Sequence, residues 1–156
     1  MKILFIGNTR LGDAILSTCI LNHFENKNVE VTVICSPLSK EIYKNFSIVK
    51  NIISIIKKKK GMHWIQAYRA LDSQVWDLII DLRNTIISRL IRKKKVIRFG
   101  RPNKKEHRVI SLCKLINLND VCPPKIPITK KNHQKALLAL KKNNLMNPIL
   151  AISPIT

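Results

Sequence analysis

The sequence predicts an α/β protein in which helices cover both faces of one parallel sheet. Three observations support this: strand-length apolar runs alternate with helical patterns, the runs are apolar almost throughout, and no low-complexity linker or internal repeat interrupts them. Parallel strands buried on both faces have such runs, and strand–helix alternation is typical of doubly wound folds with right-handed crossovers. At 156 residues, 46% of them apolar, the chain is long enough for a core of its own.

The first predicted unit is a buried strand from Lys2 to Gly7, a loop over Asn8–Gly12 and an amphipathic helix that Asp13 opens. Ser36 and Pro37 have the residue types of an N-cap and a first helical position. The later elements are expected as strands over 29–35, 49–56, 76–82, 96–100 and 149–152, and as helices over 36–46, 62–71, 85–91, 107–118 and 130–143.

Four consecutive lysines, 57–60, repel one another and are expected in a solvated loop rather than on an anionic membrane. In the helix that follows, Ile65, Tyr68 and Leu71 are spaced along one face. Packing against the sheet is the expected role of this stripe. The alternative is that Trp64 and Tyr68, beside the lysines, anchor the helix at a membrane interface.

The loop after the first strand excludes two common phosphate sites. Gly7 and Gly12 have the spacing of a P-loop, but Asp13 stands where that loop needs Lys. The dinucleotide fingerprint fails because Thr9 replaces its second glycine. Two interpretations of Asp13 remain open and are compatible: it caps the helix, or it is an ionised carboxylate that accepts a proton from a hydroxyl at a ligand cleft.

Two stretches resemble the bacterial lipopolysaccharide heptosyltransferases, glycosyltransferase family 9. The first is the opening strand, then TRLGD (9–13) and an apolar helix with Ser17 and Thr18; the second is WDLIIDLRNT (76–85), followed by Ser88 and Arg89. This resemblance implies the Rossmann-like amino-terminal, acceptor-binding half of a GT-B enzyme. It also implies inverting transfer of heptose from ADP-heptose to the lipopolysaccharide inner core, without a metal or another cofactor.

The resemblance also assigns roles to residues. Asp13 matches the proposed catalytic base of the family. The remaining site residues are expected to shape the acceptor site or to contact its acidic groups, and they are Asn8, Thr9, Arg10, Gly12, Arg83 and Arg89. The four histidines suggest neither a metal site nor a catalytic triad.

The net charge of +20 favours an acidic partner, which could be a phosphorylated glycan, an anionic membrane surface or nucleic acid. A compositional drift towards Lys, Ile and Asn would raise the charge equally without selecting any partner. A basic nucleic-acid-binding module is the alternative from another functional class. Against specific nucleic-acid binding, the sequence has no RNP, KH, zinc-finger or helix-turn-helix signature, and only 5% of its residues are aromatic.

The cysteines are spaced for neither a C-x-x-C motif nor a zinc site. Cys19 and Cys35 are expected to be buried thiols in a reduced, cytoplasmic protein that could be peripheral on the inner membrane. No apolar run has a membrane-spanning length.

The acceptor-binding domain is expected over residues 1–148, and residues 149–156 would start a second, nucleotide-sugar-binding domain. On this prediction the chain is truncated relative to the whole enzyme and inactive alone. It would be one half of a split enzyme with a separately encoded partner domain, or a remnant without activity.

Overall fold

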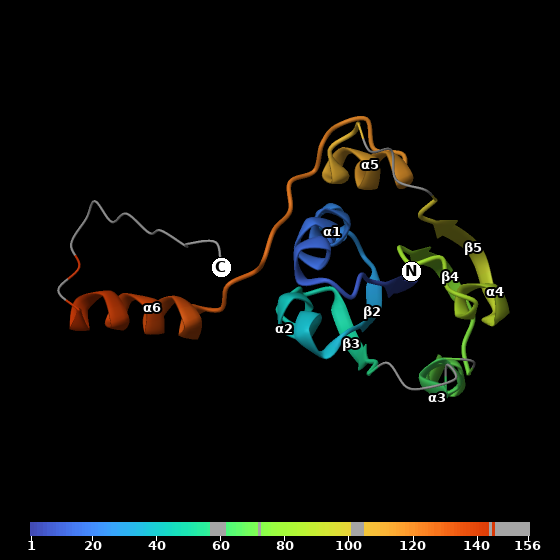
Figure 1. The fold of residues 1–156 in the computed structure, drawn as a ribbon, viewed down its shortest axis with the longest axis horizontal. Helices are drawn as coiled ribbons and strands as arrows, with labels where there is room; N and C mark the ends of the chain where they lie inside the picture. The colour runs from blue at the N-terminus through green and yellow to red at the C-terminus, as the bar shows by residue number, and fades with distance from the viewer. Residues whose placement is uncertain (57–61, 72, 101–104, 144, 146–156) are drawn as a thin grey trace.

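A five-stranded parallel sheet forms the centre of the protein in the computed structural model, which describes residues 1–56, 62–71, 73–100, 105–143 and 145. The strands lie in the order β3-β2-β1-β4-β5 (Figure 1). Their bounds are β1 Lys2–Ile6, β2 Glu30–Cys35, β3 Val49–Ser54, β4 Trp76–Asp81 and β5 Lys93–Arg98. The chain builds outward from β1 to β3 and then returns to add β4 and β5 on the other side. The order therefore reverses between β1 and β4.

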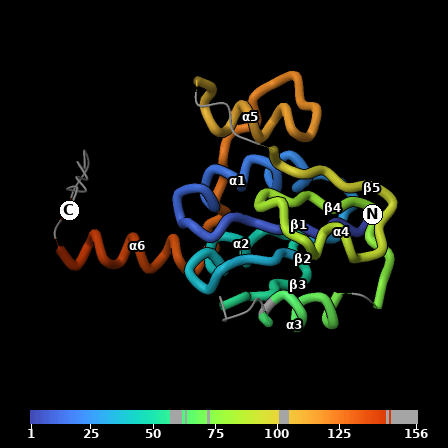
Figure 2. The backbone as a smooth tube through the Cα atoms, turned by 45° about the vertical axis from the view of Figure 1, so that its right-hand side comes forward, coloured from blue at the N-terminus to red at the C-terminus, as the bar shows by residue number. Residues whose placement is uncertain are grey.

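Helices cover both faces of this sheet. Their bounds are α1 Leu11–Phe24, η1 Pro37–Ser39, α2 Lys40–Tyr43, α3 Met62–Leu71, α4 Ile87–Leu90, α5 Arg108–Leu115 and α6 Lys130–Lys142. Side chains of α1, α2 and α5 share one hydrophobic cluster with the sheet, whereas those of α3 and α4 share a second. The tube in Figure 2 shows the strands between these helices. The predicted doubly wound, Rossmann-like α/β fold is confirmed.

Strand β1 shows why the predicted strands are apolar throughout. Ile3 and Phe5 belong to the first cluster, Leu4 and Ile6 to the second, and none of them is more than 1% exposed. Successive side chains of a strand point to opposite faces, and both faces here are covered. Strand β1 pairs with β2 on one side and β4 on the other, so its backbone is also enclosed.

Helix α1 differs from the prediction in its start and its surroundings. It begins at Leu11, so Gly12 lies in its first turn and not in the loop before it, and Asp13 is the third residue of the helix and not its opening residue. It is not amphipathic, because its buried residues lie around most of its circumference: Ala14, Ser17, Thr18, Cys19, Ile20, Leu21 and Phe24. The reason is tertiary, since α1 lies between the sheet and α5, whose Val109 and Leu112 join the same cluster.

Several other expected bounds were wrong. The helix expected over 36–46 is divided into η1 and the single turn of α2, and the one over 85–91 is reduced to α4. Strand β5 begins at Lys93 instead of 96, because pairing with β4 carries the lysines into the sheet. Helix α3 has the predicted bounds, but in its stripe Leu71 is buried whereas Ile65 is 54% exposed. The lysine run 57–60 and the strand expected over 149–152 lie outside the described residues.

Helix α6 extends away from the sheet at the end of a connector (Figures 1 and 2), and none of its residues is buried. Among the described residues, no helix is both long enough and apolar enough to span a bilayer.

Candidate functional site

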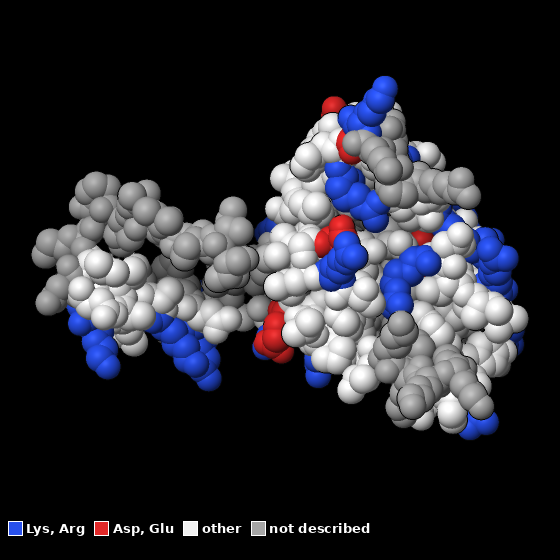
Figure 3. Space-filling view, viewed as in Figure 1, with Lys and Arg blue, Asp and Glu red and all other residues white. Residues whose placement is uncertain are grey.

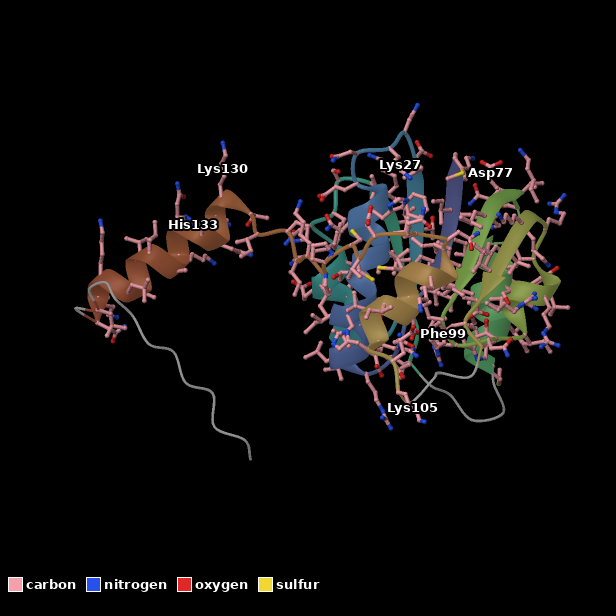
Figure 4. All side chains as sticks on the ribbon, turned by 90° about the horizontal axis from the view of Figure 1, so that it is seen from above. Lys27, Asp77, Phe99, Lys105, Lys130 and His133 are labelled. Carbon is pink, nitrogen blue, oxygen red and sulfur yellow. The ribbon has the colours of Figure 1, made fainter. Side chains whose placement is uncertain are left out.

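The loops that follow β1 and β4 meet at the carboxyl edge of the sheet. Ile6 stands opposite Asp81 in the register, and the backbone N–H of Leu82 donates to the carbonyl of Ile6 at 3.0 Å. In Figure 4, Asp77 near the start of β4 and Phe99 just after β5 mark the two ends of the sheet. The strand order reverses between β1 and β4, and in open α/β sheets such a point is where ligands bind.

The loop from Gly7 to Arg10 is held to the next strand of the sheet. The N–H of Gly7 donates to the carbonyl of Ile34 at 2.9 Å, and the Ser36 hydroxyl donates to the carbonyl of Thr9 at 3.1 Å. The side chains of Thr9 and Arg10 are exposed. Two of the predicted site residues therefore present their side chains to solvent on a loop whose backbone is tied down.

Asn8 is buried at the end of β1, with 8% of its surface exposed. Its amide nitrogen Nδ2 is buried and has no hydrogen-bond partner in the described part of the chain. A buried donor without a partner costs free energy, and such a group calls for an explanation, of which a functional role is one. The amide of Asn8 therefore has a donor at the site that is free among the described residues and that a bound ligand could use.

Asp13 is the third residue of α1 and is half-buried. The expectation that it caps the helix is wrong, because Arg10 occupies the N-cap position and makes no side-chain capping bond. Within the described chain, the Asp13 carboxylate has no hydrogen-bond or ion-pair partner. The first turn of α1 is the positive end of the helix dipole, where a carboxylate is favourably placed. A carboxylate in this position can accept a proton from a bound hydroxyl. Gly12 precedes it, with nothing within 4 Å of where a Cβ would lie.

The loop after β4 is organised by Asp81, which is completely buried. Its Oδ1 accepts from the N–H of Arg83 at 2.9 Å, and its Oδ2 accepts from the N–H and the hydroxyl of Thr85 at 2.6 and 2.9 Å. Asn84, between them, has a φ of 51°, in the left-handed region that Asn tolerates better than most residues. One inward-facing carboxylate therefore sets the path of Leu82–Thr85.

Arg83 extends from this loop over the ring of Trp64 in α3, with 5.1 Å between the guanidinium carbon and the ring centroid. Burial lowers the pKa of Arg83 from its ordinary value, and the charge of Asp81 opposes that shift. The guanidinium stays charged, since its ordinary pKa is above 12. Arg89 lies exposed on α4, which packs on the opposite face of the sheet from α1. The structure therefore brings Arg83 to the carboxyl edge but leaves Arg89 on an outer helix.

The described residues include no group of three His, Cys, Asp or Glu side chains that could hold a metal ion. The predictions about metals and cofactors stay predictions.

Sequence reasoning missed two contributors to the site. Ser36 was read only as a helix cap, but its hydroxyl makes no capping bond and instead fixes the loop after β1. Thr85 was expected at the start of a helix. In the structure its N–H and its hydroxyl both donate hydrogen bonds to the Asp81 carboxylate. The Asp-x-x-x-Thr spacing at the end of an apolar strand is a signal that could have indicated the second arrangement, because Asp side chains bond to nearby backbone N–H groups in loops.

Neither a protein-family model nor a curated protein sequence matches the chain. Its fold is similar to the E. coli heptosyltransferase WaaC with ADP, at a TM-score of 0.58 and 14% identity over 89% of this chain and 53% of that chain. WaaC with ADP-2-deoxy-2-fluoro heptose gives 0.57 and 14%, over 83% and 51%. The E. coli ADP-heptose LPS heptosyltransferase II gives 0.56 and 10%, over 94% and 52%. The chain spans about half the length of these enzymes, and its fold is that of one half of a GT-B glycosyltransferase.

Proposed function

We propose that the chain is the acceptor-binding half of an inverting heptosyltransferase that acts on the lipopolysaccharide inner core. The observation that carries this proposal is the Asp13 carboxylate, which lies half-buried in the first turn of α1 at the reversal of strand order and has no partner among the described residues. The structural similarity to heptosyltransferases supports the choice of reaction class.

In the proposed reaction, an acceptor hydroxyl oxygen attacks the anomeric carbon of ADP-heptose. A new C–O bond forms while the bond from that carbon to the diphosphate breaks, and ADP leaves with the electron pair. Asp13 takes the hydroxyl proton as the attack proceeds. Attack from the side opposite the leaving group inverts the anomeric centre.

The neighbouring residues are proposed to position the acceptor. The unpaired Nδ2 of Asn8 is a hydrogen-bond donor at the end of β1, and Thr9 and Arg10 line the exposed loop beside it. Gly12, without a side chain, leaves the approach to Asp13 open. Arg83, held by the loop that Asp81 organises, would bind acidic groups of the acceptor through its paired N–H donors, with Arg89 further out.

The donor is proposed to bind in the half of the enzyme that these 156 residues do not span. Much of the rate of a two-substrate reaction comes from holding both substrates in reacting geometry, and the leaving diphosphate needs N–H groups or cations to stabilise it. We therefore expect the 156 residues alone not to transfer heptose. The reaction is expected in the cytoplasm, at the inner membrane.

The decisive experiment replaces Asp13 by Asn in an enzyme completed with its donor-binding half, with ADP release on a heptose-deficient lipopolysaccharide acceptor as the readout. We expect kcat to fall by at least ~10²-fold, the lower end of general-base contributions. Asp120→Asn, a substitution of the same type at an exposed position in the connector, is the matched control and should leave kcat unchanged. An unchanged kcat in Asp13→Asn would remove Asp13 from the mechanism.

A further inference from the structure

An apolar pocket of about 170 Å³ lies between α3 and α4, on the face of the sheet away from α1. All the residues that line it are aromatic or aliphatic: Trp64, Ile65, Tyr68, Ile86, Ile87 and Leu90. Ile87 also belongs to the core beneath, so the floor of the pocket is part of that core. Nothing in the proposed chemistry of Asp13 uses this pocket.

The rim of the pocket is exposed to an unusual degree for large apolar residues. Ile65, Ile86 and Leu90 are 54%, 63% and 60% exposed, and Met62 in the first turn of α3 is 56% exposed. Scattered single apolar residues are normal on a surface, but a group around one pocket marks an interaction site. These side chains come from both elements that flank the pocket.

The sequence that forms one side of this pocket and continues into β5 is basic. From Leu82 to Arg98 the sequence has no Asp or Glu, and Arg69 lies in the last turn of α3. The basic residues of that stretch are Arg83, Arg89, Arg92, Lys93, Lys94, Lys95 and Arg98. Arg89 is exposed on α4, whereas Arg98 donates to Ser88, and Lys95 stands opposite Leu78, which belongs to the cluster on the α1 face. In Figure 3, Lys and Arg side chains gather at the right-hand edge, where α4 and β5 lie. One of them, Lys94, is paired with Asp77.

We propose that the α3–α4 surface docks the protein onto an anionic lipid bilayer. Exposed Ile65, Ile86 and Leu90 would enter the headgroup region, and Trp64 and Tyr68 are of the residue types enriched at that depth. The exposed cations of α3 and α4, Arg69 and Arg89, would bind lipid phosphates. A second copy of the chain is a poor occupant of this surface, because it would bring another net charge of +20 against it.

This orientation has a geometric consequence for the proposed site. Ile86 lies at the rim of the pocket and directly follows the loop that Asp81 organises at the carboxyl edge. Docking would therefore hold the carboxyl edges of β1 and β4 close to lipid headgroups, which is where a lipid-anchored acceptor sugar is found. Vesicle binding requires no chemistry at Asp13, so the two proposals can fail separately.

Tryptophan fluorescence tests which face meets the bilayer. The chain has two tryptophans: Trp64 lines the pocket, and Trp76 is 1% exposed. We expect vesicles of phosphatidylcholine and phosphatidylglycerol with brominated acyl chains to quench the emission, and vesicles of phosphatidylcholine alone not to. In Trp64→Phe, quenching should disappear while flotation with the vesicles persists. Flotation without quenching of Trp64 would overturn the proposal, because another face would then be docking.

Charge-matched variants separate a specific surface from general attraction. Arg69→Gln with Arg89→Gln should reduce the vesicle partition coefficient by at least about tenfold, because two cations that attract anionic headgroups are removed. Lys130→Gln with Lys131→Gln removes equal charge from α6 and should have a much smaller effect. Equal losses would mean that charge alone binds the vesicles.

Replacing two exposed apolar residues tests whether the apolar rim of the pocket contributes to binding. Ile65→Ser with Leu90→Ser should weaken binding, whereas Val121→Ser with Ile128→Ser, which are 57% and 72% exposed in the connector, should not. Circular dichroism and the Tm confirm that each variant is folded. A protein that does not float with anionic vesicles at all would refute the proposal outright.

Discussion

The hydroxyl of Tyr43 lies against Gly7, so closely that a Cβ at Gly7 would be 2.9 Å from the hydroxyl oxygen. The same Cβ would be 3.4 Å from the ring of Phe5. Tyr43 is completely buried, and its hydroxyl is 3.1 Å from the hydroxyl of Ser17. Glycine at position 7 therefore allows α2 to pack against the end of β1, just before the loop that carries the site.

Gly7→Ala should lower the free energy of unfolding by about 1–3 kcal/mol, the usual cost of an overpacked core. Tyr43→Phe removes the hydroxyl that the new methyl group would meet, so the double variant should be destabilised by less than the sum of the two single changes. Urea unfolding of all four proteins measures this coupling. Strictly additive effects would contradict the close approach.

Asp81→Asn should destabilise the protein by about 1–3 kcal/mol. The carboxylate uses both oxygens to accept three hydrogen bonds, whereas an amide keeps one oxygen and turns an N–H₂ group towards the other donors. Asp77→Asn at the start of the same strand is the matched control, and its effect should be smaller because its partner Lys94 is exposed. Equal urea midpoints for the two variants would count against an organising role for Asp81.

His23 should make stability depend on pH. Burial, and then the charge of Lys27, lower the pKa of His23 below its ordinary value of 6.5. The unfolded chain therefore binds the proton more tightly, so the contribution of His23 is complete above pH 6.5 and is lost as the pH falls through the folded-state pKa. The free energy of unfolding should decline between about pH 7 and pH 5.

His23→Gln should flatten that decline, whereas His133→Gln on the exposed helix α6 serves as the control and should leave it in place. Chemical unfolding at a series of pH values gives both slopes. Parallel slopes in wild type and His23→Gln would assign the pH dependence to other groups.

The thiols should differ in reactivity. Burial raises the pKa of Cys19 to about 12 and also raises that of Cys35, and both side chains are at most 1% exposed. Cys122 is only partly buried, although its pKa is raised as well. An aromatic disulfide reagent should therefore modify Cys122 first, and Cys122→Ser should remove that phase while Cys35→Ser should not. Full reaction of all four thiols would require unfolding.

The sheet could be predicted from sequence because its signals are local. Ile3 to Ile6 form an apolar run that only a doubly covered strand explains, and the buried positions confirm it. The position of the site at the carboxyl edge of the sheet was also predictable, because Asp13 and Arg83 each follow a strand that ends at that edge. Cys19 and Cys35 are buried, as predicted.

What could not be predicted depends on contacts between distant segments. No local pattern shows that α5 covers the outer side of α1, which is why α1 was expected to be amphipathic. The lysines that open β5 oppose a strand by propensity, and the ladder with β4 overrides that preference. Ile65 has core spacing in its helix, but the sheet beneath reaches Ala67 and Leu71 instead.

The position of β1 between β2 and β4 also determines the order in which the protein can form during synthesis. The N–H of Lys2 bonds to Asp77, 75 residues further along the chain, and β4 completes the ladder beside it. Until β4 has left the ribosome, one edge of the first strand stays unpaired, and the cluster around Leu4 and Ile6 lacks its β4 residues Trp76 and Ile79. Strand β1 is thus enclosed only after a segment 75 residues further along has been made, and until then its open edge is a site where aggregation can begin.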